Sequence, residues 1–315
     1  MRRARRLARV ALLAGVGFGV PIVGGAQLRQ PSIIGRWDLT ISATGASYPS
    51  WLEVQRSGDR TLVGRFVGRF GSARPISKIE STGNMFGFSI PPQWEPGDGD
   101  LRVEGTLSGD EIAGWLLDPA GNRQTWTGRH APTLRRETLP EFGTPITLFD
   151  GSDMSRWRPS GDTQWRIINR ILTNTRTGAN LITRDTFTDF KLHVEFRYPK
   201  GSNSGVYLRG RYEVQIEDST QPDEAVSERL GAIYGFLAPN ANVAKRPGEW
   251  QAFDITLVGR LVTVVLNGKT IIGAQEIPGI TGGALDSDEA KPGPLLLQGD
   301  HGSMEFRNIY LTPAK

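Results

Sequence analysis

From about residue 32 onward, apolar and polar residues alternate in short runs that Gly, Pro, Asn and Asp interrupt every few positions. A period of two is typical of β-strands with one buried face, and no stretch convincingly shows the 3.6-residue period of an amphipathic helix. Short strands joined by tight turns favour an antiparallel up-and-down barrel or a sandwich. In the first block, residues 32–132, we predict strands at 35–41, 50–56, 61–70, 76–81, 86–90, 101–107, 111–117 and 123–129.

A second block of strand patterns covers residues 144–313. Its Asn267-Gly268 pair is the strongest hairpin signal in the chain, because both residues tolerate the positive φ of a two-residue turn. So many short strands indicate a two-sheet jelly roll, in which the longer loops 219–231, 237–249 and 275–293 would build a binding cleft. The predicted strands lie at 147–149, 165–168, 171–173, 179–183, 190–198, 204–208, 212–217, 232–236, 250–258, 261–266, 270–274, 294–298 and 304–311.

The stretch between the two blocks, residues 130–145, contains three prolines and no sustained periodicity. Such a composition predicts an extended connector. We therefore predict an all-β chain with a small antiparallel barrel at 27–132, a linker at 133–143 and a two-sheet jelly roll at 144–315. The length of 315 residues fits this division, since a domain has about 150 residues.

The first 26 residues have a different character. Five arginines precede a short apolar run containing Gly and Pro, and the small residues Gly24 and Ala26 come just before Gln27. This pattern is typical of a secretory signal peptide cleaved near Ala26, and the Arg5-Arg6 pair permits twin-arginine export. We expect a periplasmic or secreted protein whose mature form has no membrane span; an uncleaved N-terminal anchor is the alternative.

Composition removes several classes of function. The formal net charge is +4, but the five arginines of the predicted signal peptide account for it. Without them, the chain has 32 basic and 33 acidic residues, a net charge of −1. This near-neutral charge gives no reason to expect a nucleic-acid partner. The absence of Cys excludes a disulfide scaffold, a thiolate zinc site and a cysteine nucleophile.

The ends of the first block resemble those of lipocalin-like barrels. The opening Gly35-Arg36-Trp37 and the closing Trp126-Thr-Gly-Arg129 carry the resemblance. It implies that Trp37 closes the base of a barrel and that an Arg of the last strand packs across it. Five tryptophans lie in this block, and they are expected in the barrel core; a sugar-stacking role for Trp51 or Trp94 is the alternative.

The candidate chemistry centres on the predicted strand 212–217. Because side chains alternate between faces, Tyr212, Val214 and Ile216 share an apolar face, and Glu213, Gln215 and Glu217 share a polar one. If 204–209 pairs with this strand, Tyr207 and Arg209 extend the polar face. The alternative is the ordinary solvated face of an outer strand.

The Glu-x-Gln-x-Glu spacing is similar to the Glu-x-Asp-x-Glu strand of jelly-roll β-glucanases, in which two carboxylates act in a retaining mechanism. Here an amide replaces the middle carboxylate, which removes the like charge that would tune its neighbours. A retaining β-glycosidase using Glu213 and Glu217 therefore stays an alternative.

Residues 144–313 resemble the 3-keto-disaccharide hydrolase family, which is built on a concanavalin-A/glucanase-like jelly roll; residues 27–131 are not covered. The resemblance is carried by Leu148–Asp153 with Trp157, Asn203–Arg209, Tyr212–Gln215, Gly231–Gly235, Ala238-Pro239 with Asn242, Pro247–Gln251, Asn267-Gly268, Leu297–Gly302 and Phe306–Ile309. It implies a substrate already oxidised at C3, whose C2 hydrogen is acidic. A base removes that hydrogen, the C1 substituent leaves, and water adds back. An upstream sugar 3-dehydrogenase would supply such a substrate.

Roles follow from this implied reaction. Glu213 is the favoured base, with Glu217 as the alternative, and His301 is the acid/base partner. Arg209 or Lys245 would stabilise the enolate, and a divalent cation held by His301 with Glu213 or Glu217 is an alternative to them. His130 and His193 are assigned to structure. Sugar hydroxyls and the sugar ring would contact Asn203, Gln215, Tyr234, Asn242 and Gln298, with Trp250 or Tyr207 stacking on the ring. A non-catalytic carbohydrate-binding jelly roll is the remaining alternative.

Overall fold

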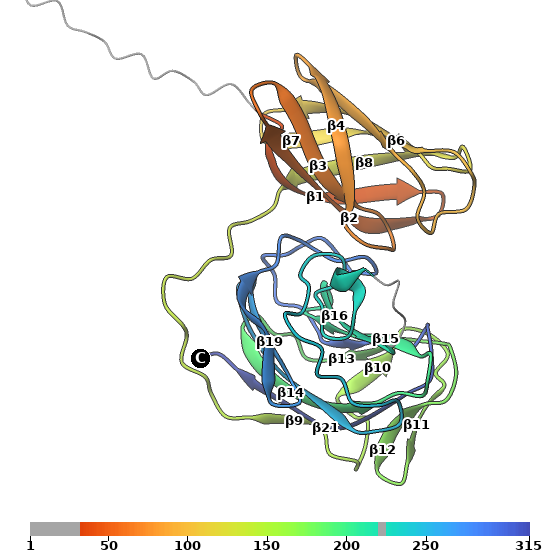
Figure 1. The fold of residues 1–315 in the computed structure, drawn as a ribbon, viewed down its shortest axis with the longest axis vertical. Helices are drawn as coiled ribbons and strands as arrows, with labels where there is room; N and C mark the ends of the chain where they lie inside the picture. Colours follow the sequence, from red (N-terminus) through yellow and green to blue (C-terminus); the bar gives the residue numbers. More distant parts are fainter. Residues whose placement is uncertain (1–31, 220–224) are drawn as a thin grey trace, which may run out of the picture. The chain divides into compact units, whose positions relative to one another are not determined.

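The computed structural model describes residues 32–219 and 225–315, so the predicted signal peptide lies outside the described residues. The described residues fall within one compact unit. Strands and loops make up this unit, together with the short 3-10 turn η1 (Val226–Glu228), as Figure 1 shows. The prediction of an all-β chain is confirmed. No helix within the described ranges has the length and apolar character that crossing a membrane requires.

The first eight strands close into an antiparallel barrel, drawn from red to yellow in Figure 1. Each strand pairs with the next, and the last pairs back with the first. Burial alternates along the strands, because alternate side chains point into the barrel. The strands are β1 (Gly35–Ala43), β2 (Ala46–Ser57), β3 (Thr61–Val67), β4 (Arg74–Thr82), β5 (Met85–Ile90), β6 (Leu101–Ser108), β7 (Glu111–Leu117) and β8 (Arg123–His130).

The end of the barrel at Trp37 differs in one detail from what the lipocalin-like resemblance implies. Trp37 is fully buried and donates its indole N–H to the carbonyl oxygen of Ile33. The residue that stacks on it is His130, with ring centroids 3.7 Å apart. Arg129 is 83% exposed and pairs with Glu111 on the outside of the barrel. The expectation of a packing arginine was wrong, because strand alternation turns Arg129 outward and leaves His130 directly opposite Trp37.

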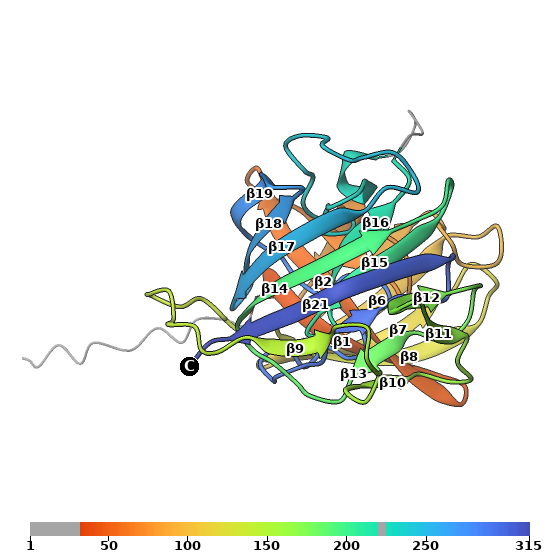
Figure 2. The same cartoon turned by 90° about the horizontal axis from the view of Figure 1, so that it is seen from below.

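The remaining strands form two sheets. The five-stranded sheet has the order β10 (Trp157–Pro159), β13 (Leu181–Thr183), β20 (Leu296–Leu297), β15 (Asn203–Leu208) and β16 (Tyr212–Glu217). In the larger sheet β9 (Ile146–Phe149) pairs with β21, and Figure 2 shows β21, β14 and β17 side by side. The order of this larger sheet is β11 (Trp165–Ile168), β12 (Ile171–Asn174), β21 (Met304–Pro313), β14 (Phe190–Arg197), β17 (Gln251–Val258), β18 (Leu261–Leu266) and β19 (Lys269–Glu276).

The two sheets bury one apolar core between them, which includes Val214 and Ile216 from the smaller sheet and Phe196 and Phe253 from the larger one. The predicted two-sheet architecture is therefore confirmed. The hairpin prediction is also confirmed, since Asn267 and Gly268, both at positive φ, join β18 to β19.

The strand predicted at 232–236 was wrong. Ile233 and Leu237 exchange both backbone hydrogen bonds and so close a tight turn. Only an isolated bridge joins Ile233 to Val214 of β16. Gly231, Ala232 and Tyr234 bond the backbone of β16, whereas Ile233 bonds within the turn, so this segment lies along the edge of β16 without forming a strand of its own.

Barrel residues contact the sandwich through several polar groups. Arg36 pairs with Glu276 at 2.6 Å, Ser287 donates to the carbonyl oxygen of Leu39, and the amide of Gly283 donates to the carbonyl oxygen of Arg69. Trp51 of β2 is fully buried and packs edge-on against Phe236. Trp51 thus belongs to a core and is not a sugar-stacking platform. The division at 27–132, 133–143 and 144–315 into separate domains stays a prediction.

Candidate active site

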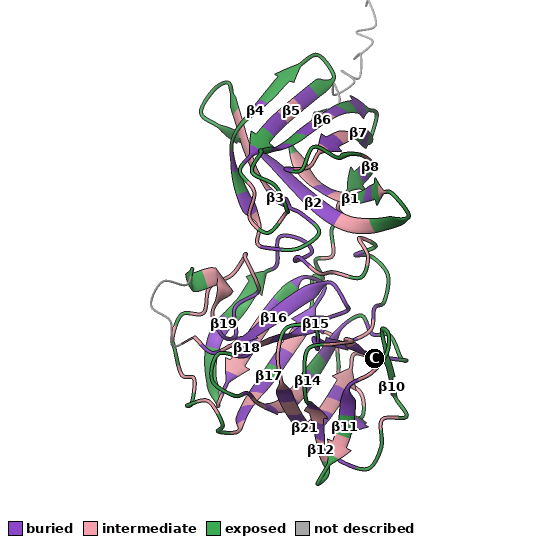
Figure 3. Cartoon of the chain, turned by 90° about the vertical axis from the view of Figure 1, so that its right-hand side faces the viewer, coloured by how far each residue is buried: buried purple, intermediate pink, exposed green. Residues whose placement is uncertain are grey.

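Glu213 lies near the middle of β16 with a side chain that is almost fully buried. Figure 3 shows β15 and β16 largely in the buried colour. The alternation predicted for this strand is correct, but its polar face is covered, since Gln215 is buried as well. The alternative of an ordinary solvated strand face was therefore wrong. A buried, polar strand face needs partners, and those partners define the site.

Tyr207 is the direct neighbour of Glu213 on β15, because the two residues are paired in the strand register. Its hydroxyl lies 2.9 Å from Oε2 of Glu213 and 2.9 Å from the carbonyl oxygen of Gly282. Gly205 makes room for the carboxyl group, since a Cβ there would lie 2.2 Å from Oε1 of Glu213. The Asn203–Leu208 strand thus both shapes and hydrogen-bonds the Glu213 side chain.

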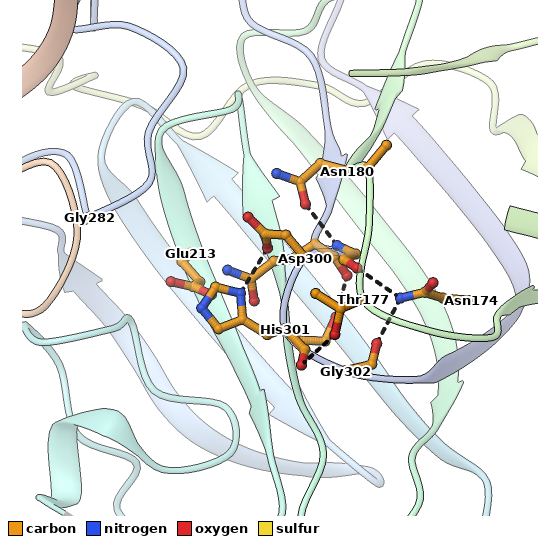
Figure 4. A network of polar contacts seen from close by, with 12 residues as sticks. Asn174, Thr177, Asn180, Glu213, Gly282, Asp300, His301 and Gly302 are labelled. Carbon is orange, nitrogen blue, oxygen red and sulfur yellow. Dashed lines mark hydrogen bonds and ion pairs between the residues drawn. The ribbon is translucent and has the colours of Figure 1, made fainter. Parts of the chain in front are cut away.

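His301 approaches Glu213 from the loop between β20 and β21. Figure 4 shows its imidazole between the side chains of Asp300 and Glu213. Nδ1 of His301 lies 2.7 Å from Oδ1 of Asp300, and about half of the His301 side chain is exposed. A carboxylate on one ring nitrogen orients an imidazole and leaves the other nitrogen available for proton transfer. The sequence prediction that His301 accompanies Glu213 agrees with this arrangement.

The loop that carries His301 is fixed by amide side chains from the neighbouring segment 174–180 (Figure 4). Asn174 donates to the carbonyl oxygens of Gly299 and Gly302, at 3.1 and 2.7 Å. The amide of Gly299 donates to Oδ1 of Asn180 at 2.8 Å. These bonds hold the loop backbone and therefore the position of the His301 ring.

The electrostatics of the site favour protons on both main groups. Burial raises the pKa of Glu213 to about 8; the Tyr207 hydrogen bond and the imidazole of His301 act in the opposite direction without cancelling it. The Asp300 hydrogen bond raises the pKa of His301, and the negative charge of Glu213 adds to this effect. Burial alone would raise the pKa of Asp300, but the hydrogen bond and charge of His301, together with hydrogen bonds from the backbone and Asn180, outweigh burial and leave the pKa lowered. A carboxyl group with a raised pKa beside an imidazole with a raised pKa suits acid–base chemistry.

Two glutamines add polar groups beside these residues. Nε2 of Gln215 donates to Oε2 of Glu217 at 3.1 Å. The amide oxygens of Gln215 and Gln298 are buried and have no hydrogen-bond partner among the described residues. Unpaired buried acceptors of this kind are suited to ligand hydroxyl groups.

Tyr234 and Asn203 also lie at this site. The amide of Tyr234 donates to the carbonyl oxygen of Glu213, and the charges of Glu213 and Glu217 act on its hydroxyl. Burial is the main reason why the pKa of Tyr234 is raised. Asn203 is paired with Glu217 across β15 and β16. The structure thus brings together eight of the predicted residues, namely Asn203, Tyr207, Gln215, Glu213, Glu217, Tyr234, Gln298 and His301.

Two predicted enolate-stabilising cations lie elsewhere. Arg209 is buried and donates to the hydroxyl of Tyr212 and to the carbonyl oxygen of Gly259. Because Tyr212 and Glu213 are consecutive strand residues, this guanidinium lies on the face opposite to the Glu213 side chain. Lys245 is exposed and donates to the carbonyl oxygen of Trp250. Neither cation contacts Glu213.

Two predicted sugar-binding residues are also apart from Glu213. Trp250 is in contact with the guanidinium groups of Arg307 and Arg197, at 4.0 and 4.8 Å from its ring centroid. Both arginines belong to the larger sheet, so the ring has cationic protein partners there. Asn242 accepts a hydrogen bond from the amide of Ala244 within the exposed loop 237–249.

The two remaining histidines have structural contacts, as predicted. Nδ1 of His193 lies 2.7 Å from Oδ1 of Asp254, and His130 stacks on Trp37. Across the described ranges, no group of three or more His, Asp or Glu side chains has an arrangement that would hold a metal ion. The suggested cation site at Glu213, Glu217 and His301 therefore has no support in the geometry.

Sequence reasoning missed the residues that position His301, which are Asp300, Asn180 and Asn174. Asp300 directly precedes His301, so an adjacent Asp-His pair in a Gly-flanked loop was an available signal. Asn174 and Asn180 act over more than 100 residues of separation, and no local pattern points to them.

Comparison with known proteins gives a family. The profile of the 3-keto-alpha-glucoside-1,2-lyase-like domain matches residues 144–312. Among solved structures, the chain is similar to two proposed glycosyl hydrolases from Parabacteroides distasonis. One is 29% identical with a TM-score of 0.47, covering 56% of this chain and 93% of that one. The other is 16% identical with a TM-score of 0.47, covering 54% and 94%.

A carbohydrate-binding module from Bacillus subtilis is 11% identical with a TM-score of 0.37, covering 53% of this chain and 98% of its own. No curated protein matches the chain. The family profile covers more than half of the 315 residues and includes Glu213 and His301. The chain is therefore a glycosyl hydrolase-like, carbohydrate-active protein, and it belongs to the 3-keto-alpha-glucoside-1,2-lyase-like domain family.

Proposed function

We propose that this protein cleaves glycosides whose sugar ring carries a ketone at C3. The observation that supports this most is the buried carboxyl group of Glu213 beside the Asp300–His301 pair. A C3 ketone acidifies the hydrogen on C2, so cleavage needs a base at C2 and an acid at the leaving oxygen. Glu213 and His301 supply one of each.

The first step is proton abstraction by Glu213. Its carboxylate takes the C2 hydrogen, and the C–H electron pair becomes the C2–C3 double bond of an enolate. A carboxyl group with a pKa of about 8 is a stronger base than an ordinary glutamate once it is ionised. The imidazolium of His301, whose positive charge acts on Glu213, offsets the negative charge of the enolate.

The second step is departure of the C1 substituent. The enolate re-forms the C3 ketone, the C1–C2 double bond forms, and the C1–oxygen bond breaks. His301 gives its proton to the leaving oxygen, because Asp300 keeps the imidazole protonated up to a higher pH. Water then adds to C1, and a proton returns to C2, so that the net reaction is hydrolysis.

The sugar ring is held by the polar groups around Glu213. The unpaired amide oxygens of Gln215 and Gln298 accept from ring hydroxyls. Tyr234 and Asn203 lie on the same side and supply further hydrogen bonds. Arg209, Lys245, Asn242 and Trp250 are not part of this binding site.

We place this chemistry outside the cytoplasm, on the basis of the signal-peptide pattern at residues 1–26. The ketone must be introduced before cleavage, so a sugar 3-dehydrogenase acts upstream. The near balance of acidic and basic residues after Ala26 suits a neutral sugar substrate.

The test uses the purified chain with methyl 3-keto-glucoside and the unoxidised methyl glucoside, in D₂O. We expect release of 3-ketoglucose from the first substrate only, with deuterium at C2. Glu213→Gln should abolish release, and Glu141→Gln, at an exposed carboxylate, should not.

Three results would contradict the proposal. Absence of release from any 3-keto-glycoside would exclude it. Cleavage of unoxidised β-glycosides that Glu213→Gln abolishes would indicate a retaining glycosidase. Sugar binding that survives both Glu213→Gln and His301→Ala, without any turnover, would indicate a carbohydrate-binding protein.

A further inference from the structure

The barrel contains a pocket that the proposed reaction does not use. It has a volume of about 230 Å³ and opens between the loop after β3 and the loop after β5. We call it the barrel-mouth pocket. The side chains that define its character are Tyr48, Phe66, Arg69, Phe70, Trp94 and Leu116. Its volume is slightly below that of sites for drug-sized ligands, so it suits a group of one or two rings.

The floor of the pocket is apolar and its rim is aromatic. Phe66, Leu101 and Leu116 are buried core residues of the barrel. At the rim, 68% of Trp94 and 55% of Phe70 are exposed, although both are large apolar side chains. Exposed aromatic rings above an apolar floor favour a flat ligand that stacks on them. The carboxylates of Glu95 and Asp118 also line the pocket, but Glu95 is paired with Arg74, and Asp118 with Asn122 and Gln124.

Arg69 adds a positive charge to this rim. Its guanidinium lies 5.1 Å from the ring centroid of Phe70 and 5.7 Å from that of Tyr48. The hydroxyl of Tyr48 donates to Oε1 of Gln124 at 2.8 Å, and both side chains line the pocket. A guanidinium plane, a phenol and an amide together suit an aromatic ring that bears a hydroxyl or ether oxygen.

The rim is directly connected to the candidate active site. The amide of Gly283 donates to the carbonyl oxygen of Arg69 at 3.0 Å. A Cβ on Gly282 would lie 2.4 Å from the carbonyl oxygen of Gly71, so the two backbones touch. The carbonyl oxygen of Gly282 also lies 2.9 Å from the hydroxyl of Tyr207, the partner of Glu213.

Trp94 makes a second connection. A Cβ on Gly71 would lie 2.8 Å from Cδ1 of the indole, which therefore stands over the same loop. On the other side, the Trp94 side chain faces the hydroxyl of Tyr234 and acts to lower its pKa, against the larger effect of burial. The backbone amide of Tyr234 donates to the carbonyl oxygen of Glu213. Gly282 and Tyr207 thus connect the loop beside the barrel-mouth pocket to the group proposed to act at C2.

We propose that the barrel-mouth pocket binds an aromatic leaving group of the glycoside while the sugar ring lies at Glu213. This inference rests on the proposed function, because it assigns the second half of the same substrate. The barrel then acts as the leaving-group subsite, and Trp94 and Phe70 are the residues that stack on the departing ring.

The first test measures binding without turnover. The full chain with Glu213→Gln is titrated with 2-naphthol by calorimetry, and we expect saturable binding. Adding Trp94→Ala or Phe70→Ala should weaken it about tenfold each. Met85→Ala, at an equally exposed apolar residue elsewhere on the barrel, should leave it unchanged.

The second test compares naphthyl and methyl 3-keto-glucosides as substrates. Trp94→Ala should raise KM for the naphthyl substrate about tenfold more than KM for the methyl one. If Trp94→Ala weakens naphthol binding but neither substrate is turned over, the proposed function is refuted and the aromatic binding site is supported. If both substrates are turned over, naphthol does not bind, and Trp94→Ala changes KM equally for the two, the aromatic binding site is refuted and the proposed function is supported. Competition by free glucose at the pocket would overturn its aromatic specificity.

Discussion

The hydroxyl of Tyr207 lies 2.9 Å from the carboxyl group of Glu213 and 2.9 Å from the carbonyl oxygen of Gly282. One hydroxyl hydrogen cannot serve both acceptors. When Glu213 is ionised, Tyr207 donates to it; when Glu213 is protonated, its own proton points to Tyr207, and Tyr207 donates to Gly282. The hydroxyl can therefore follow the protonation state of Glu213 by rotation alone.

Tyr207→Phe is expected to raise the pKa of Glu213 further. The Tyr207 hydrogen bond lowers this pKa against the dominant effect of burial, so its removal favours the protonated acid. The acidic limb of the kcat/KM profile, which reports ionisation of the base, should shift upward by about one pH unit. Tyr310→Phe is the control, because Tyr310 lies on β21 beside His193. An unchanged acidic limb in Tyr207→Phe would show that Glu213 is not the titrating base.

Glu213→Gln is expected to lose activity and gain stability. Loss of the base should lower kcat by about 100- to 10,000-fold. The folded pKa of about 8 exceeds the ordinary value of 4.5, so the wild-type chain is favoured by protonation and loses stability as the pH rises from 4.5 to about 8.

The amide introduced by Glu213→Gln cannot ionise, so this variant does not lose stability as the pH rises. The melting temperature of Glu213→Gln should match that of the wild type at the acidic end and exceed it by about 5 °C above pH 8. Thermal unfolding across this range measures the difference, with Glu141→Gln as the exposed control. A constant difference at every pH would mean that Glu213 does not titrate on folding.

Asp300→Asn tests how His301 is tuned. The Asp300 hydrogen bond is the main reason why the pKa of His301 is raised, so its loss should move this pKa back toward 6.5. Because His301 acts as an acid, the limb of the kcat/KM profile that reports its ionisation should move to lower pH. The chain offers a matched control in Asp254→Asn, since Asp254 makes the same 2.7 Å contact with His193. Equal shifts in both variants would exclude a specific role for Asp300.

Much of this site was predictable from the sequence. Period-two alternation placed Glu213 and Gln215 on one face of a strand. That Tyr207 joins this face was predicted only if 204–209 pairs with the strand, and the structure pairs Tyr207 directly with Glu213. Arg209 was misplaced because it adopts a positive φ of 53° at the turn between β15 and β16, which ends the strand alternation one residue early.

Other features depend on contacts that no local pattern contains. The polar face of β16 is covered by residues about 70 positions away, such as Thr281, which accepts from the amide of Glu213. Alternation shows which side chains share a face, but it does not show whether a distant loop covers that face. For the same reason the sequence did not reveal the barrel loop that touches Gly282.

Asp38→Asn tests the contact between the barrel and the loop 275–293. Burial raises the pKa of Asp38, on β1, to about 9, and the negative charge of Glu289 adds to this effect. Glu289 is fully buried and accepts from Arg260 and Tyr212, at 2.8 and 2.7 Å. Asp38 is thus the carboxyl group of this contact whose pKa is raised.

The sign of the effect follows from the raised pKa. The folded chain holds the Asp38 proton up to about pH 9, whereas the unfolded chain releases it near 3.8, so stability falls as the pH rises between these values. Asp38→Asn carries no charge to bury and should therefore unfold at a higher temperature than the wild type near pH 9. The control Asp59→Asn, at an exposed barrel turn, should have the same melting temperature as the wild type. A lower melting temperature for Asp38→Asn at that pH would show that Asp38 is ionised in the fold and that Arg260 and Arg211, which lower its pKa, prevail over burial.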